Sequence, residues 1–440
     1  MREADLTRNM IIIVATFCTA LMLSSGCKKS EDKMALLSAL GGDPDVYAGS
    51  SPEGDFIEVT IDRSSKKVNY TNYTSSETLT DMDYVWLDPA DAFSDPNPGG
   101  FSILYRIDLP SPPYAPGGYV MFAEIPGEVV VFAGFDSADG MLEPPTFAFK
   151  RKDVKQSQYY ERAFNWLHVK ADDGDGEPDM MCGFAASDSS DNNGRLYGAE
   201  YSIHDDASAD INPEVLGIGD LVQEAESGAF VWWTAPEPHE WADSIVMIGD
   251  PTSAAQLIYG ENQGGGGAFA LPQASSKDFQ PAYAGTYAAM LYQYDKGAAP
   301  GDEESVETHT IVITAGGGVQ VFNFGENTST GTPLFSDTAM TPVADYDSES
   351  LVNDLNTYSL LNDALDHANF PGIRNAYLCH GAFIAEGSID ENPATAVIIF
   401  DPEGGFAGFH IYDCYESGDG SDDILGFGLA IKDTNFVNPD

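Results

Sequence analysis

Short runs of β-branched and aromatic residues, bounded by Gly, Pro, Asp and Asn, recur along most of this 440-residue chain. Such runs are typical of β-strands, and the residues that bound them are typical of turns. The predicted strands are 56–62, 67–73, 101–107, 119–124, 129–135, 283–294, 308–314, 319–324, 396–400 and 406–412. Three turns, at 125–128, 315–318 and 401–405, each separate two apolar runs and therefore predict hairpins.

Helical periodicity is rarer. It is clearest at 351–368, where Pro371 follows the last turn, and weaker at 154–169 and 213–226. The sequence therefore predicts a mainly β protein, built from two antiparallel β-sandwich or β-barrel-like domains with a few short helices.

A glycine-rich segment marks the boundary between these domains. Residues 260–276 (GENQGGGGAFALPQASS) contain four consecutive glycines and little to bury. The predicted organisation is a signal peptide (1–26), a flexible tether (27–50), an N-terminal β-rich domain (51–262), a linker (263–277) and a C-terminal β-rich domain (278–440).

Two fragments occur in the same order on both sides of the linker. The hairpin segment 126–132 is similar to 317–322, and the acidic segment 174–184 is similar to 418–427. These echoes suggest that a β-rich unit has been duplicated.

The N-terminus has the features of an export signal. Arg2 and Arg8 precede an apolar run, 10–23, which is too short to span a bilayer. The small residues 24–26 then lead directly to Cys27, whose thiol can carry a diacylglyceryl group after cleavage.

The segment LSSGC resembles the lipobox of bacterial lipoproteins, with Leu23 at minus four rather than minus three. The following stretch, KKSEDKMALLSALGGD, resembles spirochaetal lipoproteins. This resemblance implies lipidation of Cys27, and Lys28 after it implies the outer membrane. We therefore expect an exported protein with an N-terminal lipid anchor, facing the periplasm or the cell surface.

The chain is strongly acidic. It has 70 Asp and Glu against 20 Lys and Arg, a net charge of −50. Such a charge repels nucleic acid and anionic headgroups and favours cations or basic partners. Because 43% of the residues are hydrophobic and 11% are aromatic, the acidity does not indicate disorder.

The acidic fragments are the only motif with evident chemistry. Aspartates at alternate positions of a glycine-bent loop can direct their oxygens at one hard cation. The first copy resembles the calcium loop of FG-GAP and VCBS repeats, which implies the ligands Asp173, Asp175 and Asp179, although Ala171 replaces an acidic ligand. In the second copy Asp419 and Asp423 match the pattern. Calcium is therefore the predicted cofactor.

Three cysteines remain in the mature chain, Cys182, Cys379 and Cys414, so at most one internal disulfide can form. Cys379 and Cys414 lie in the same segment and are the candidate pair. That all three are buried thiols is an equally good interpretation.

The sequence contains no GxSxG, HExxH, P-loop or dinucleotide-binding motif. We therefore expect no enzymatic activity but a binding or structural role, with an extracellular protein or glycan as partner and no nucleic acid. The alternative is a calcium-dependent secreted hydrolase that acts on polysaccharide, because a catalytic carboxylate pair cannot be picked out among 70 acids.

Overall fold

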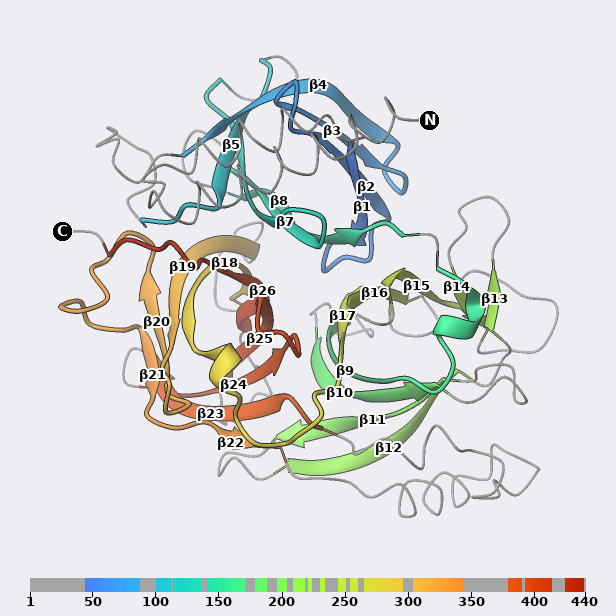
Figure 1. Cartoon of the computed structure of the whole chain (residues 1–440), viewed down its shortest axis with the longest axis vertical. Coiled ribbons are helices and arrows are strands. Elements are labelled where there is room, and N and C mark those ends of the chain that lie inside the picture. The colour runs from blue at the N-terminus through green and yellow to red at the C-terminus, as the bar shows by residue number, and fades with distance from the viewer. Residues whose placement is uncertain are drawn as a thin grey trace, which may run out of the picture.

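The computed structural model describes residues 44–87, 100–111, 114, 116–135, 141–152, 154–170, 179–187, 196–203, 209–217, 221–223, 230–233, 244–250, 254–259, 265–295, 304–343, 379–389, 392–413 and 424–438. These residues form a mainly β fold whose paired strands are antiparallel, which confirms the predicted fold class. The strands make three sheets (Figure 1). The predicted hairpins are present, because antiparallel strands pair across each of the turns 125–128, 315–318 and 401–405.

The N-terminal sheet is a closed barrel in which each strand pairs with the next and β1 pairs with β8. Its strands are β1 (Asp45–Ser50), β2 (Ile57–Asp62), β3 (Lys67–Asn72), β4 (Glu77–Trp86), β5 (Leu104–Asp108), β6 (Tyr119–Ile125), β7 (Val129–Phe135) and β8 (Met141–Lys150). A closed barrel leaves no edge strand open for pairing with another chain.

The second sheet has nine strands in the order β12-β11-β10-β9-β17-β16-β15-β14-β13. A short 3-10 helix, η1 (Gln156–Gln158), precedes it. Its strands are β9 (Ala163–Lys170), β10 (Asp179–Ser187), β11 (Leu196–Ile203), β12 (Ala209–Gly217), β13 (Leu221–Gln223), β14 (Phe230–Trp233), β15 (Ser244–Asp250), β16 (Ala254–Tyr259) and β17 (Gly267–Pro272).

The third sheet also has nine strands, in the order β21-β20-β19-β18-β26-β25-β24-β23-β22. The 3-10 helix η5 (Pro281–Tyr283) leads into it. Its strands are β18 (Gly285–Tyr294), β19 (Glu304–Ile313), β20 (Val319–Asn323), β21 (Phe335–Asp337), β22 (Thr341–Pro342), β23 (Ala382–Ile389), β24 (Asn392–Phe400), β25 (Phe406–Asp413) and β26 (Ile424–Lys432).

The two nine-stranded sheets share one topology. In each, the first four strands follow one another to one edge of the sheet, and the remaining five return from the opposite edge until the ninth pairs with the first. The sequence echoes do not follow this repeat. The segment 126–132 belongs to the barrel. The acidic fragments run into β10 and β26, which are the second strand of one sheet and the ninth of the other and are therefore not equivalent. A structural repeat exists, but not the one that the echoes indicate.

Three further elements differ from the expected boundaries. The last residues of the expected tether form β1, in which Tyr47 and Ala48 pair with β2 on one side of the chain and with β8 on the other. The expected linker contains β17, where an apolar run follows the glycines and pairs with β16 and β9. Within the weaker predicted helix 154–169, the described residues form η1 and β9. The predicted helix 351–368 lies outside the described residues.

Each sheet encloses a hydrophobic cluster on its concave side, and a fourth cluster lies where the three sheets meet. Phe269 of β17 is completely buried there, and its ring centroid lies 5.6 Å from that of Phe147 (β8) and 5.3 Å from that of Phe427 (β26). Strands at this junction are apolar on both faces because both faces are covered, as in β7, where every residue is buried. The three sheets therefore share one core.

The β24–β25 turn begins with a buried carboxyl group. Asp401 is 6% exposed, and its Oδ2 accepts a hydrogen bond of 3.1 Å from the amide of Gly405. Burial raises the pKa of Asp401 to about 6, against the lowering effect of the amides of Gly405 and Glu403. The folded protein therefore holds the proton of Asp401 to a higher pH than the unfolded chain does.

Replacing Asp401 with asparagine is expected to stabilise the protein at pH 7.5 but not at pH 4. As the pH rises from 4, Asp401 loses its proton in the unfolded wild-type chain but keeps it in the folded chain to about pH 6. The free energy of unfolding of the wild type therefore falls as the pH rises through this range. The shift of roughly 2 pKa units sets an upper limit of about 3 kcal/mol on the gain. Melting temperatures of both proteins at the two pH values measure it.

Asp62→Asn is the control, because this substitution should change the stability in the opposite direction. The hydroxyls of Ser64 and Ser65 hold the pKa of exposed Asp62 near 2, so its contribution is present above about pH 4 and is lost as the pH falls through 2. This variant should lose stability at pH 7.5. An Asp401→Asn variant that gains nothing between pH 4 and pH 7.5 would contradict the interpretation.

Candidate functional site

The barrel interior is lined by alternate residues of its eight strands. The ring of Phe122 lies at its centre and stacks on Tyr105 and Phe132, with centroid distances of 4.9 and 5.1 Å. Tyr84 meets Phe122 edge to face at 5.5 Å. An eight-stranded barrel is just wide enough to be filled by side chains or to hold one small ligand. Which of the two holds here depends on the other side chains of the barrel.

One end of the barrel carries a partly buried network of charges. Arg63 follows β2 and lies 2.7 Å from the Glu124 carboxylate, measured from Nη2 to Oε2. Arg63 also pairs with Asp45, which in turn pairs with Lys150. Tyr47 accepts a hydrogen bond of 3.1 Å from Arg63. Polar contacts thus connect three strands, β1, β6 and β8, with the turn that follows β2.

The network sets the charge states of its members. Burial raises the pKa of Glu124, whose side chain is fully buried, and the positive charge of Arg63 opposes this shift. Burial also acts to raise the pKa of Asp45, but the hydrogen bonds from Lys150 and Arg63 outweigh it and hold that pKa below its ordinary value. The ionised form of the buried Glu124 side chain therefore depends on the positive charge of Arg63.

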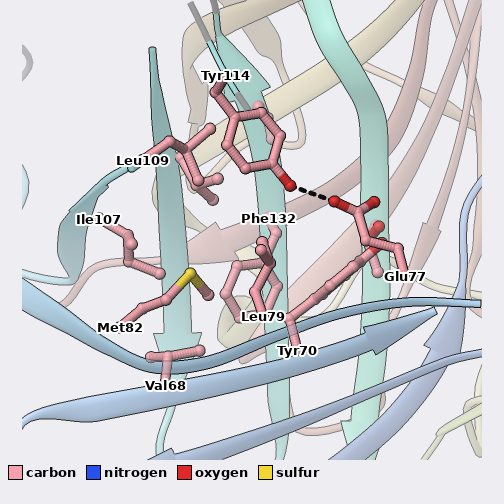
Figure 2. Close-up of a pocket in the computed structure, with 13 residues that line it drawn as sticks. Val68, Tyr70, Glu77, Leu79, Met82, Ile107, Leu109, Tyr114 and Phe132 are labelled. Atoms are coloured by element: carbon pink, nitrogen blue, oxygen red, sulfur yellow. Dashed lines mark hydrogen bonds between the residues drawn. The ribbon is translucent and has the colours of Figure 1, made fainter. Parts of the chain in front are cut away.

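The barrel also contains a pocket (Figure 2). Glu77 at its rim starts β4 in register with Asn72, which pairs with Ile57 at the start of β2, whereas Arg63 follows the end of β2. The pocket has a volume of about 50 Å³. It is lined by Val68, Tyr70, Glu77, Leu79, Met82, Ile107, Leu109, Tyr114, Val120, Phe132, Ala133, Gly134 and Thr146.

The pocket is apolar in its depth and polar at one point of its rim. Val68, Ile107 and Phe132 are buried, whereas Glu77 and Tyr114 are partly exposed. The Tyr114 hydroxyl donates a hydrogen bond to the Glu77 carboxylate across 37 residues of sequence (Figure 2). An apolar cavity with one well-placed polar group is typical of a ligand-binding site.

Most of the predicted site residues lie outside the described residues. These are Cys27, Asp173, Asp175, Asp419, Asp423 and Cys414. Asp179 opens β10, where its backbone is in register with Lys170 of β9. Cys379 is buried in the core shared by the three sheets, and the predicted disulfide stays a prediction because Cys414 is not described.

Within the part of the chain that the structure describes, no group of three or more His, Cys, Asp or Glu side chains is placed to hold a metal ion. Among the same residues there is no helix with the length and apolar character needed to cross a membrane. The calcium loops therefore stay predictions.

The pocket residues were not identified from the sequence. The alternation of strands β3 and β4 indicates which side chains face inward, but Glu77 is one of 70 acidic residues, and no local pattern distinguishes it. Tyr114 lies in the β5–β6 connection, where no periodicity exists to place it. Only the closure of the barrel brings the two side chains together.

Comparison with known proteins identifies no family. No protein-family model matches the chain, and no curated protein matches it. Among solved structures, a double mutant of transferrin binding protein B from Haemophilus parasuis Hp5 is 8% identical, covers 89% of this chain and 76% of its own, and gives a TM-score of 0.25. Intact Ap-TbpB, with N and C lobes, is 10% identical, with 89% and 77% coverage and a TM-score of 0.24. TM-scores of this size do not establish a common fold.

Proposed function

We propose that this protein is an exported bacterial lipoprotein with a binding role, held at the outer membrane through Cys27, and that its N-terminal barrel is the binding module. The pocket in the barrel carries the proposal. It combines an apolar depth with a single carboxylate–phenol pair at the rim. Such a lining binds and orients a small group.

The composition of the pocket favours binding over the hydrolase alternative. Glycoside hydrolysis uses two carboxyl groups about 5–9 Å apart on either side of the scissile bond. Among the residues that line the pocket, Glu77 is the only acid, and its neighbours are mainly apolar. An extracellular protein or glycan stays the proposed larger partner, and the net charge of −50 weighs against nucleic acid.

The anchor is proposed from the signal and from the position of the barrel. Cys27 follows the export signal, and β1, which begins at Asp45, starts the first described domain. A barrel attached by a short segment to a lipidated cysteine would be held close to the membrane. Calcium binding by the two acidic loops is retained as part of the proposal.

Replacing Cys27 with alanine is expected to abolish incorporation of labelled palmitate and to move the protein from the membrane fraction to the soluble fraction. The physical reason is that the acyl chains, at about 0.8 kcal/mol for each buried CH₂ group, supply the membrane affinity. Labelling and fractionation of cells that produce each form measure it.

Replacing Cys182 with alanine is the matched control, because this cysteine is buried in the core and should not affect labelling. If wild-type protein is found unlabelled in the soluble fraction, the anchoring part of the proposal is wrong.

A further inference from the structure

We propose that the barrel pocket binds a small aliphatic ammonium compound, with its alkyl group among Val68, Ile107 and Phe132 and its ammonium group beside Glu77. This inference rests on the proposed binding role of the barrel and names the class of its ligand. Three properties of the pocket lead to it: its size, the chemistry of its rim and the charge around it.

The size of the pocket limits the apolar part of the ligand. An engineered protein cavity of about 150 Å³ binds benzene, whereas this pocket measures about 50 Å³. It therefore has room for an alkyl group of about three or four carbons and not for an aromatic ring. Because the deep residues Val68 and Ile107 are buried and aliphatic, an alkyl group placed there leaves water entirely.

The rim determines the head group. Glu77 is the only charged residue of the lining. An ionised carboxylate offers about four acceptor sites, and the Tyr114 hydroxyl uses one oxygen, Oε1. A positively charged donor can therefore bind the carboxylate without breaking the pair. The rings of Tyr70 and Tyr114 also line the pocket, and aromatic faces attract ammonium groups.

The charge of the whole protein acts in the same direction. A net charge of −50 raises the local concentration of cations and lowers that of anions. A ligand with the same alkyl group and a carboxylate, such as a short fatty acid, would be repelled both by this negative field and by Glu77. The ligand is therefore a cation with a short apolar tail.

The test compares three probes with the same four-carbon tail: butylamine, 1-butanol and pentanoate. Each is titrated into the folded soluble chain from Lys28, labelled at Ile, Leu and Val methyl groups, and NMR shifts of Val68 and Ile107 report occupancy. We expect butylamine to bind roughly fivefold more tightly than 1-butanol at low salt, the upper range for a partly exposed ion pair. Pentanoate should bind most weakly, and high salt should reduce the difference between the amine and the alcohol.

Two variants assign the preference to the rim. Glu77→Gln should bind 1-butanol as before and lose the preference for butylamine. Asp83→Asn is the matched control, because it removes a carboxylate from the same strand, β4, at an exposed position paired with Lys67. Its preference for butylamine should equal that of the wild type.

The outcomes separate the two proposals. If all three probes leave the Val68 and Ile107 methyl signals unchanged, the pocket is not a binding site, and the proposed function of the barrel fails with the inference. If 1-butanol or pentanoate binds as tightly as butylamine, the pocket binds a ligand but the ammonium class is wrong. A preference that persists in Glu77→Gln would also overturn the assignment.

Discussion

Replacing Arg63 with methionine is expected to lower the free energy of unfolding of the barrel by about 3–5 kcal/mol, because it leaves the fully buried Glu124 carboxylate without its counter-charge. Methionine keeps most of the side-chain volume, so the loss reports the charge rather than a cavity. Urea unfolding, together with hydrogen exchange of the β6 amides, measures the effect.

The variant should also change the pH dependence. Without Arg63, burial raises the pKa of Glu124 further above its value in the unfolded chain. A raised folded pKa stabilises the protein below the unfolded pKa of about 4.3, and this contribution is lost as the pH rises through the folded pKa. The difference between wild type and variant should therefore be small at pH 4 and largest at pH 7–8.

Two further variants test this account of the network. Glu124→Gln in the Arg63→Met background should recover part of the lost stability, because it removes the uncompensated charge. Arg151→Met removes an arginine from a half-exposed pair with Glu58 on the same barrel and should cost no more than about 1 kcal/mol. Equal losses from Arg63→Met and Arg151→Met would show that burial of the pair has no energetic consequence.

The strands could be predicted because their evidence is local. Val129–Phe135 and Phe406–Asp413 combine β-branched or aromatic residues with flanking turns, and both are strands in the structure. The hairpins could be predicted for the same reason, because a short turn such as 125–128 makes the two strands that flank it pair with each other.

The division into sheets could not be predicted, because it depends on pairs that are distant in sequence. Gly267 pairs with Val169, which makes part of the expected linker a central strand of the second sheet. The glycines there indicate a flexible segment by composition, and only the apolar residues that follow them indicate a strand. Local patterns do not choose between two such assignments when the partner strand lies about a hundred residues away.

The candidate site could not be predicted from the sequence for a related reason. Arg63 and Glu124 are 61 residues apart, and Glu77 and Tyr114 are 37 residues apart. In so acidic a chain, a carboxylate with a special environment looks like every other carboxylate. The acidic loops could be recognised in the sequence because their residues cluster along the chain, whereas the polar contacts of the barrel join residues that are distant in sequence.

Replacing Phe269 with alanine is expected to lower the free energy of unfolding by about 3–5 kcal/mol, the usual cost of removing a buried aromatic ring. The ring is completely buried and contacts Phe147 of the barrel and Phe427 of the third sheet, while β17 itself belongs to the second sheet. Because one side chain touches all three sheets, hydrogen exchange should accelerate in β8 and β26 as well as in β17.

Phe230→Ala is the matched control, because Phe230 is also buried and belongs to the hydrophobic cluster of the second sheet, where its ring centroid lies 4.4 Å from that of Tyr159. A similar loss of stability with faster exchange confined to that sheet is expected. Gly408 of β25 gives a second test, since a Cβ there would lie 2.1 Å from the Phe269 ring. Gly408→Ala should therefore destabilise the wild type more than it destabilises Phe269→Ala, where the ring is gone. If Phe269→Ala and Phe230→Ala accelerate exchange in the same strands, the three sheets do not depend on this ring for their association.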